Sequence, residues 1–371
     1  MKFGRVAGWL IIVGAAFVAG VIWSHKAIWP FPQLLAFKNT HITPQKSWRV
    51  TGTSALPGPL SLDNSGVQEL VGLAYKPLYS DLEADFWMNT SACPRFDYFL
   101  FDLIGGARQC NRLSYRDHGL SQYSVLVTHP GPASERRGLL VYNHGHNGPP
   151  IESERFAQDF LQGVFSAGYD VLLVSMPLVG FNEPIGKVQL KTFDGLTMTD
   201  RAATLGHAVF ETLEVGASNY LRFFIDDAVF FIAATAKSYH SVSYAGHSGG
   251  AWSGLYVCSA LREIISRCFL SSGVMPLSIR VSEGFRSFGD AEQISGEINR
   301  AFPVVEEIES ISTNMDVLFS YNSRDPCCYN GVMPTKFKDL LEGRGIKVDF
   351  VIGNASSHSY DPDIATRFIV K

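Results

Sequence analysis

One short segment of the chain combines a serine with the small neighbours that nucleophilic catalysis requires. Ser248 lies within Gly246-His247-Ser248-Gly249-Gly250, where small residues permit a very tight turn. The residues from Val242 to Ala245 favour a strand before this turn, and the uncharged run from Ala251 to Val257 favours a helix after it. Such a strand-turn-helix arrangement presents the serine hydroxyl for attack on an acyl carbon. We therefore predict that Ser248 is a nucleophile.

A serine hydroxyl needs a base that takes its proton, and histidine suits this task at neutral pH. His358 is the only histidine after Ser248, and it lies in the polar segment 355–360 that follows the last expected strand. A loop at this place can carry the imidazole over the serine. The alternative is a solvated surface histidine. The position of His358 after the serine in the chain favours its role as the base.

The imidazole needs a carboxylate that fixes its tautomer and stabilises its cation. Asp325 follows the expected strand 317–321, on the loop where this acid should lie. A plain turn-forming aspartate before Pro326 is the alternative interpretation. Other aspartates lie at the wrong end of that strand, in an expected helix or after the histidine: Asp316, Asp339, Asp361 and Asp363.

The oxyanion that forms on attack needs N–H donors that are in place before the reaction. We predict the backbone N–H of Gly249 as one donor and that of His146, in the segment 143–148, as the other. A competing idea is that His144 and His146 bind a metal ion, but no third ligand of obvious spacing accompanies them. We therefore expect neither a metal nor a cofactor.

These segments together make the chain resemble the α/β-hydrolase superfamily over about residues 123–371. The segments 143–148 and 246–250 are most similar to those of acetyl-xylan-esterase-like and dienelactone-hydrolase-like proteins, with serine in place of the cysteine of the latter. The resemblance implies a serine hydrolase that cleaves a small-molecule or polymer-linked carboxylic ester through an acyl-enzyme. The alternatives are a peptidase of the same fold and a non-catalytic interaction protein.

From Tyr123 onward, strand-like and helix-like segments alternate along the chain. This alternation predicts an α/β fold with a mainly parallel sheet and helices on both faces. Polar stretches at 182–204 and 273–314 interrupt the pattern, and we expect insertions there. Residues 27–122 are irregular and rich in proline and glycine, so we expect a linker and an N-terminal extension before a catalytic domain at 123–371.

Residues 1–26 have the character of a membrane signal. Lys2 and Arg5 precede an uncharged stretch from Val6 to Trp23, which is at the lower limit for crossing a bilayer. We expect an uncleaved transmembrane anchor, with its basic end in the cytoplasm and the catalytic domain on the extracytoplasmic side. A cleaved signal peptide, which would give a secreted or periplasmic protein, is the main alternative, and a buried N-terminal helix is the other.

Composition and charge exclude other classes of protein. The 371 residues include 46% hydrophobic and 18% charged ones, as in an ordinary globular protein, and the net charge of −4 argues against nucleic acid as a partner. Six cysteines are compatible with an oxidising compartment, although their pairing cannot be derived from the sequence. Cys93 with Cys110 is our closest guess, whereas Cys258 and Cys268 also suit buried thiols.

Overall fold

A computed structural model gives the architecture. It describes residues 60–89, 106–116, 118–131, 138–148, 154–182, 187–191, 197–201, 207–212, 220–283 and 290–371. The predicted anchor at 1–26 and the predicted pairing of Cys93 with Cys110 lie outside this set. None of the helices within it combines the length and the apolar character that crossing a membrane requires.

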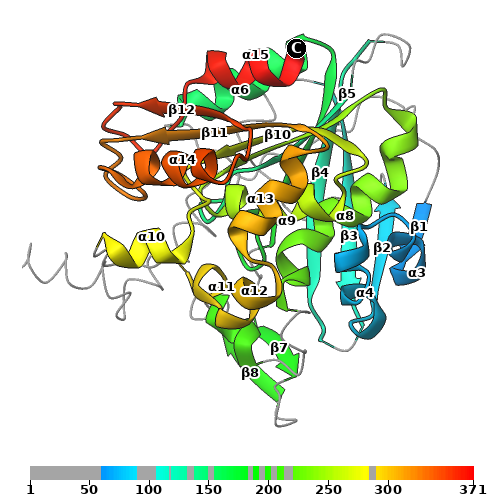
Figure 1. Cartoon of the computed structure of the whole chain (residues 1–371). Coiled ribbons are helices and arrows are strands. Elements are labelled where there is room, and N and C mark those ends of the chain that lie inside the picture. Colours follow the sequence, from blue (N-terminus) through cyan, green and yellow to red (C-terminus); the bar gives the residue numbers. More distant parts are fainter. Residues whose placement is uncertain are drawn as a thin grey trace, which may run out of the picture. The chain divides into compact units, whose positions relative to one another are not determined.

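Ten strands form one sheet (Figure 1), in the order β1-β2-β3-β4-β6-β5-β9-β10-β11-β12. Their bounds are β1 (Leu60–Asp63), β2 (Ala84–Asn89), β3 (Ala107–Tyr115), β4 (Ser121–Thr128), β5 (Gly138–Asn143), β6 (Tyr169–Val174), β9 (Val242–His247), β10 (Ile265–Ser271), β11 (Asp316–Asn322) and β12 (Asp349–Gly353). Two further strands, β7 (Lys187–Lys191) and β8 (Thr197–Arg201), pair as a separate antiparallel hairpin.

The sheet is mixed rather than mainly parallel. Strands β6, β5, β9, β10, β11 and β12 run parallel to one another, whereas β1, β2, β3 and β4 are joined by antiparallel pairing. The sheet therefore reaches back to Leu60, beyond the boundary at Tyr123 that the sequence indicated. Strand β3 explains why: its buried side chains include the polar Gln109 and Asn111, so it lacks the apolar alternation by which a strand is found.

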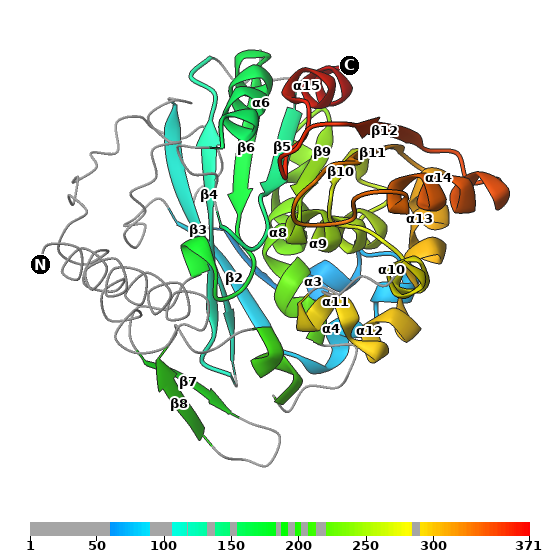
Figure 2. The same cartoon turned by 90° about the vertical axis from the view of Figure 1, so that its left-hand side faces the viewer.

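Helices cover both faces of the parallel part of the sheet (Figure 2). The α-helices are α3 (Asn64–Gln68), α4 (Leu78–Asp81), α6 (Arg155–Ser166), α8 (Arg222–Thr235), α9 (Gly249–Ala260), α10 (Leu277–Ser282), α11 (Ala291–Ile294), α12 (Gly296–Ala301), α13 (Val304–Ser312), α14 (Met333–Gly343) and α15 (Pro362–Val370). Short 3₁₀ turns are η2 (Leu73–Tyr75), η4 (Gly180–Asn182), η6 (His207–Thr212) and η7 (Ala236–Ser238). Helices α6 and α15 pack together on one face, and α8, α9 and α13 pack on the other.

Strand β5 shows how the sequence builds the two cores. Leu139 and Val141 belong to the core under α8 and α9, while Leu140 and Tyr142 belong to the core under α6 and α15. Alternate residues of a strand point to opposite faces, so a strand covered on both sides must be apolar throughout. The central position of β5 places the loop that follows Asn143 next to the end of β9.

A disulfide joins Cys258 of α9 to Cys268 of β10 inside the larger core. This bond corrects the interpretation of these two residues as buried free thiols. The two cysteines lie ten residues apart, and the disulfide ties α9 to the strand on which it packs. The described cysteines include no free thiol.

Candidate active site

Ser248 occupies the turn between β9 and α9 with φ 52° and ψ −130°, a backbone conformation that few non-glycine residues adopt. Its neighbours must be small, because a Cβ at Gly246 would lie 2.7 Å from Ala251 Cα and one at Gly250 would lie 2.7 Å from Asn143 Oδ1. The backbone N–H of Ser248 donates to Ser271 O over 2.8 Å, which fixes the turn to β10. The predicted strand-turn-helix is present.

Asp325 and His358 lie in contact. Asp325 follows β11, His358 follows β12, and His358 Nδ1 donates to Asp325 Oδ2 over 2.7 Å. Asp325 is buried, with only 1% of its surface exposed, so water competes little for this hydrogen bond. The Asp325 carboxylate therefore holds the proton of His358 on Nδ1 and leaves Nε2 as the basic nitrogen.

Ser248 and its flanking glycines form a tight turn that we call the elbow. The His358 ring lies directly beside it. Its centroid is 4.4 Å from that of His247, the residue before Ser248. Its Nε2 atom is buried and has no hydrogen-bond partner among the residues that the structure describes, and the Ser248 hydroxyl accordingly makes no hydrogen bond to it. Catalytic hydrogen bonds of this kind are often loose without substrate and tighten when substrate binds.

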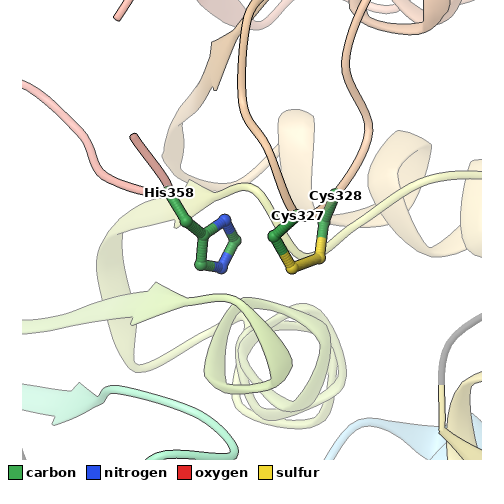
Figure 3. A group of neighbouring side chains, drawn as sticks. All are labelled: Cys327, Cys328 and His358. Atoms are coloured by element: carbon green, nitrogen blue, oxygen red, sulfur yellow. A yellow bond between two sulfur atoms is a disulfide. The ribbon is translucent and has the colours of Figure 1, made fainter. Parts of the chain in front are cut away.

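The second oxygen of Asp325 is also held in place. Asp325 Oδ1 accepts the backbone N–H of Cys327 over 2.7 Å and that of Cys328 over 3.2 Å. These two adjacent cysteines form a disulfide next to His358, as Figure 3 shows. The sulfur atoms and one ring nitrogen of His358 all lie within 4.8 Å of one another. Both oxygens of the acid are thus positioned, and one of them depends on the disulfide loop.

The loop after β5 packs onto the first turn of α9. Gly145 has φ 91°, and a Cβ there would lie 2.7 Å from the Gly249 nitrogen. A Cβ at Gly249 would overlap the His146 ring and lie 2.6 Å from Met176 Sδ. The backbone segments that carry the predicted oxyanion donors, the N–H groups of His146 and Gly249, are therefore in contact, and neither group donates to another in the described part of the chain.

His144 has a structural role that separates it from His146. Its Nε2 donates to Glu154 Oε2 over 3.0 Å, and its Nδ1 accepts from the Tyr142 hydroxyl over 2.7 Å. Tyr142 in turn bonds the hydroxyl of Tyr360 over 3.1 Å, which ties the loop of His358 to the end of β5. The metal-binding pair of His144 and His146, considered from the sequence, does not form.

His146 meets residues that the sequence did not single out. Its Nε2 lies 2.8 Å from Asp290 Oδ2 and 2.9 Å from Glu292 Oε1, while His207 Nδ1 lies 3.0 Å from Glu292 Oε2. Burial lowers the pKa of His146, but hydrogen bonds to the two carboxylates outweigh it and raise the pKa to about 9. Burial raises the pKa of Glu292, and the two histidines more than reverse this, to about 2.

His247 completes the surroundings of the base. Burial lowers its pKa well below the usual value, and the positive charge that His358 or His144 can carry lowers it further. His247 therefore stays neutral beside His358 and adds no charge that would oppose protonation of the base. No motif in the sequence announces this role, since the tight turn itself does not require a histidine before Ser248.

The serine turn after a strand, the acid after β11 and the histidine after β12 follow one another in the order of the α/β-hydrolases. With the mixed ten-stranded sheet covered by helices on both faces, they define an α/β-hydrolase fold. This assignment rests on the strand order and on the geometry of the turn.

No protein-family model and no curated protein sequence matches the chain. Among solved structures, Est1E from Butyrivibrio proteoclasticus is similar at 15% identity, with 68% of this chain and 94% of that chain covered and a TM-score of 0.45. An S-formylglutathione hydrolase from Agrobacterium tumefaciens is similar at 12% identity, with 72% and 93% covered and a TM-score of 0.47. The acylaminoacyl peptidase of Pyrococcus horikoshii is similar at 12% identity, with 78% and 46% covered and a TM-score of 0.46.

Proposed function

We propose that the chain is a serine hydrolase that cleaves a carboxylic ester, in a small molecule or on a polymer, through an acyl-enzyme on Ser248. The contact between His358 and Asp325 beside the elbow carries this proposal. It places the proton of the neutral ring on Nδ1, so that Nε2, which has no hydrogen-bond partner among the described residues, keeps the lone pair that a general base needs.

In the proposed reaction, His358 Nε2 takes the hydroxyl proton while Ser248 Oγ attacks the ester carbonyl. The N–H groups of His146 and Gly249 donate to the oxyanion of the tetrahedral intermediate. His358 then returns its proton to the alcohol, which leaves, and Ser248 keeps the acyl group. Water, activated by the same histidine, releases the acid. Asp325 stabilises the imidazolium in both halves of the reaction.

Covalent labelling with a fluorophosphonate tests the nucleophile. Wild type should be labelled at Ser248, and Ser248→Ala should lose both labelling and ester hydrolysis while its Tm stays nearly unchanged. Ser266→Ala is a matched control, because the Ser266 hydroxyl donates to Val242 O where β9 and β10 begin, at the ends of these strands opposite Ser248. Labelling that persists in purified Ser248→Ala would contradict the proposal. Nitrophenyl esters of short and long acyl chains, run beside peptide nitroanilides, separate an esterase from a peptidase.

We further propose that residues 1–26 anchor the protein in a membrane with the catalytic domain on the extracytoplasmic side. The apolar stretch between Arg5 and Ser24 supports this, together with the basic residues before it. The full chain should fractionate with membranes, and protease added outside intact cells or spheroplasts should digest it. Full protection from that protease would contradict the proposed topology. Isolation of a mature chain that begins near Val21 would show that the segment is a cleaved signal peptide and not an anchor.

A further inference from the structure

Three side chains beside the active site converge from segments that are far apart in the sequence. His146 lies in the loop after β5, His207 in η6, and Glu292 in α11. One donor atom from each lies within 4.8 Å of the others. The exposed Asp290 adds a carboxylate oxygen 2.8 Å from His146 Nε2. Imidazole nitrogens and carboxylate oxygens are the donors that zinc and similar divalent metals take in proteins.

The tautomer of His207 is the first argument for a ligand at this place. Its Nε2 lies 2.8 Å from the carbonyl oxygen of Pro177, which can only accept a hydrogen bond, so this nitrogen carries a proton. Nδ1 is thus the nitrogen left to bind a metal ion, and it faces Glu292 Oε2 at 3.0 Å. A divalent cation can replace the proton between these two atoms and bind both. Histidines that bind metals commonly donate their other N–H to a backbone carbonyl, as His207 does.

The burial of Glu292 is the second argument. Its side chain is fully buried, and its two oxygens face His146 Nε2 and His207 Nδ1, so the carboxylate and both rings already point at one place. Glu292 and Asp290 together bring two negative charges to two imidazole rings. The ring nitrogens and carboxylate oxygens lie 2.8 to 3.0 Å apart, so they need to separate by only about 0.5 Å to become tetrahedral ligands of one zinc ion, whose bonds are about 2.0 to 2.2 Å long.

We propose that His146, His207 and Glu292, with Asp290 as a fourth ligand, bind one divalent transition-metal ion such as Zn²⁺. The ion joins the loop after β5 to two other connecting segments, since His207 belongs to the segment between β6 and α8 and Glu292 to the segment between β10 and β11. Its role is to position that loop and not to activate substrate. This positioning role rests on the proposed function, because His146 also supplies an oxyanion donor there. The proposal that the site binds a metal does not depend on that function.

Metal binding to the full-length protein tests the site. After treatment with EDTA and its removal, Zn²⁺ added in a calorimetric titration should bind at one ion per chain and raise Tm. Glu292→Gln and His207→Ala should each weaken binding at least tenfold. Glu283→Gln is the matched control: it removes a carboxylate of the same insertion, which pairs with Lys336 outside the site, and should bind Zn²⁺ as wild type does.

Two further measurements keep the test independent of folding defects and of activity. Co²⁺ added to the wild-type protein should give visible absorption bands of a nitrogen- and oxygen-ligated ion, with no variant required. Ser248→Ala should bind Zn²⁺ with unchanged affinity, even though the proposed reaction is lost. If neither Zn²⁺ nor Co²⁺ binds the wild-type protein at about 1 mM, which is far weaker than protein zinc sites, the cluster is a closed ion pair and the proposal is overturned.

Discussion

The backbone N–H of Cys327 donates a 2.7 Å hydrogen bond to Asp325 Oδ1, the oxygen of the acid that does not meet His358. Cys328 adds a second donor to the same oxygen, and its side chain is bonded to that of Cys327. The carboxylate is thus oriented by its own loop before it orients the imidazole. This arrangement keeps the negative charge of Asp325 fixed while His358 changes its protonation state, as a preorganised acid–base pair requires.

Asp325→Asn should lower kcat for ester hydrolysis by about 10²- to 10⁴-fold, because an amide can donate to Nδ1 and favour the wrong tautomer of His358. Combining it with His358→Ala should cost little more than His358→Ala alone, since the two residues act as one unit. Asp316→Asn, at the other end of β11, is the control. Near-full activity of Asp325→Asn would require a different acid.

Reduction of the Cys327–Cys328 disulfide should lower kcat by about tenfold with little change in KM, because the loop that orients Asp325 loses a constraint while both N–H donors remain. Cys327 is exposed, so a soluble phosphine or dithiol can reach the bond. The double change Cys327→Ser with Cys328→Ser should have the same lowered kcat and no longer respond to reductant. Equal kcat of oxidised and reduced wild type would show that the disulfide does not support the acid.

The candidate triad could be predicted from the sequence because each member follows a strand of the parallel part of the sheet. Such strands end at one edge, so the loops after β9, β11 and β12 meet in space whatever lies between them. Ser248, Asp325 and His358 can therefore be chosen by their order and by the apolar runs before them. The contact of His358 with Asp325 is the outcome of that rule.

Other features depend on contacts that no local pattern announces. Strand β3 belongs to the same sheet, but its polar Gln109 and Asn111 are buried, and Asn111 donates a hydrogen bond to Ser124 of β4. His207 lies just after the polar stretch 182–204 and Glu292 lies within 273–314, and only the fold brings them to His146. The Cys327–Cys328 bond had one signal in the sequence, the adjacency of the two cysteines after Asp325.

Gly273→Ala should disturb the elbow although this residue is far from Ser248 in sequence. A Cβ at Gly273 would overlap the Ser248 carbonyl oxygen and lie 2.7 Å from Ala251 Cβ. Overpacking of this kind costs about 1–3 kcal/mol, so Tm should fall by several degrees and kcat with it. Gly343→Ala, where an added Cβ meets open space, should retain full activity. Wild-type Tm and kcat in Gly273→Ala would mean that the turn packs more loosely than described.

Asp227→Asn should stabilise the protein above about pH 7, because burial raises the pKa of Asp227 from 3.8 to about 7. The nearby Ser124 hydroxyl lowers this pKa in part, but neither carboxylate oxygen is within full hydrogen-bonding geometry of a described residue. Since the folded pKa lies above the unfolded value, the folded state binds more protons between these two pH values. The free energy of unfolding therefore falls as pH rises through this window, by up to about 4 kcal/mol. Asparagine carries no charge to bury, so in Asp227→Asn this fall in the free energy of unfolding does not occur.

Thermal unfolding at two pH values measures this effect. The Tm of Asp227→Asn should exceed that of wild type by several degrees at pH 8, and the difference should shrink towards pH 4, where the wild-type carboxyl is neutral in the folded state. Asp349→Asn, which changes an exposed carboxylate at the start of β12, should leave the difference between pH 4 and pH 8 as in wild type. A lower Tm of Asp227→Asn at pH 8 would mean that a cationic or hydrogen-bonding partner stabilises the ionised Asp227, since removing a paired buried charge is destabilising.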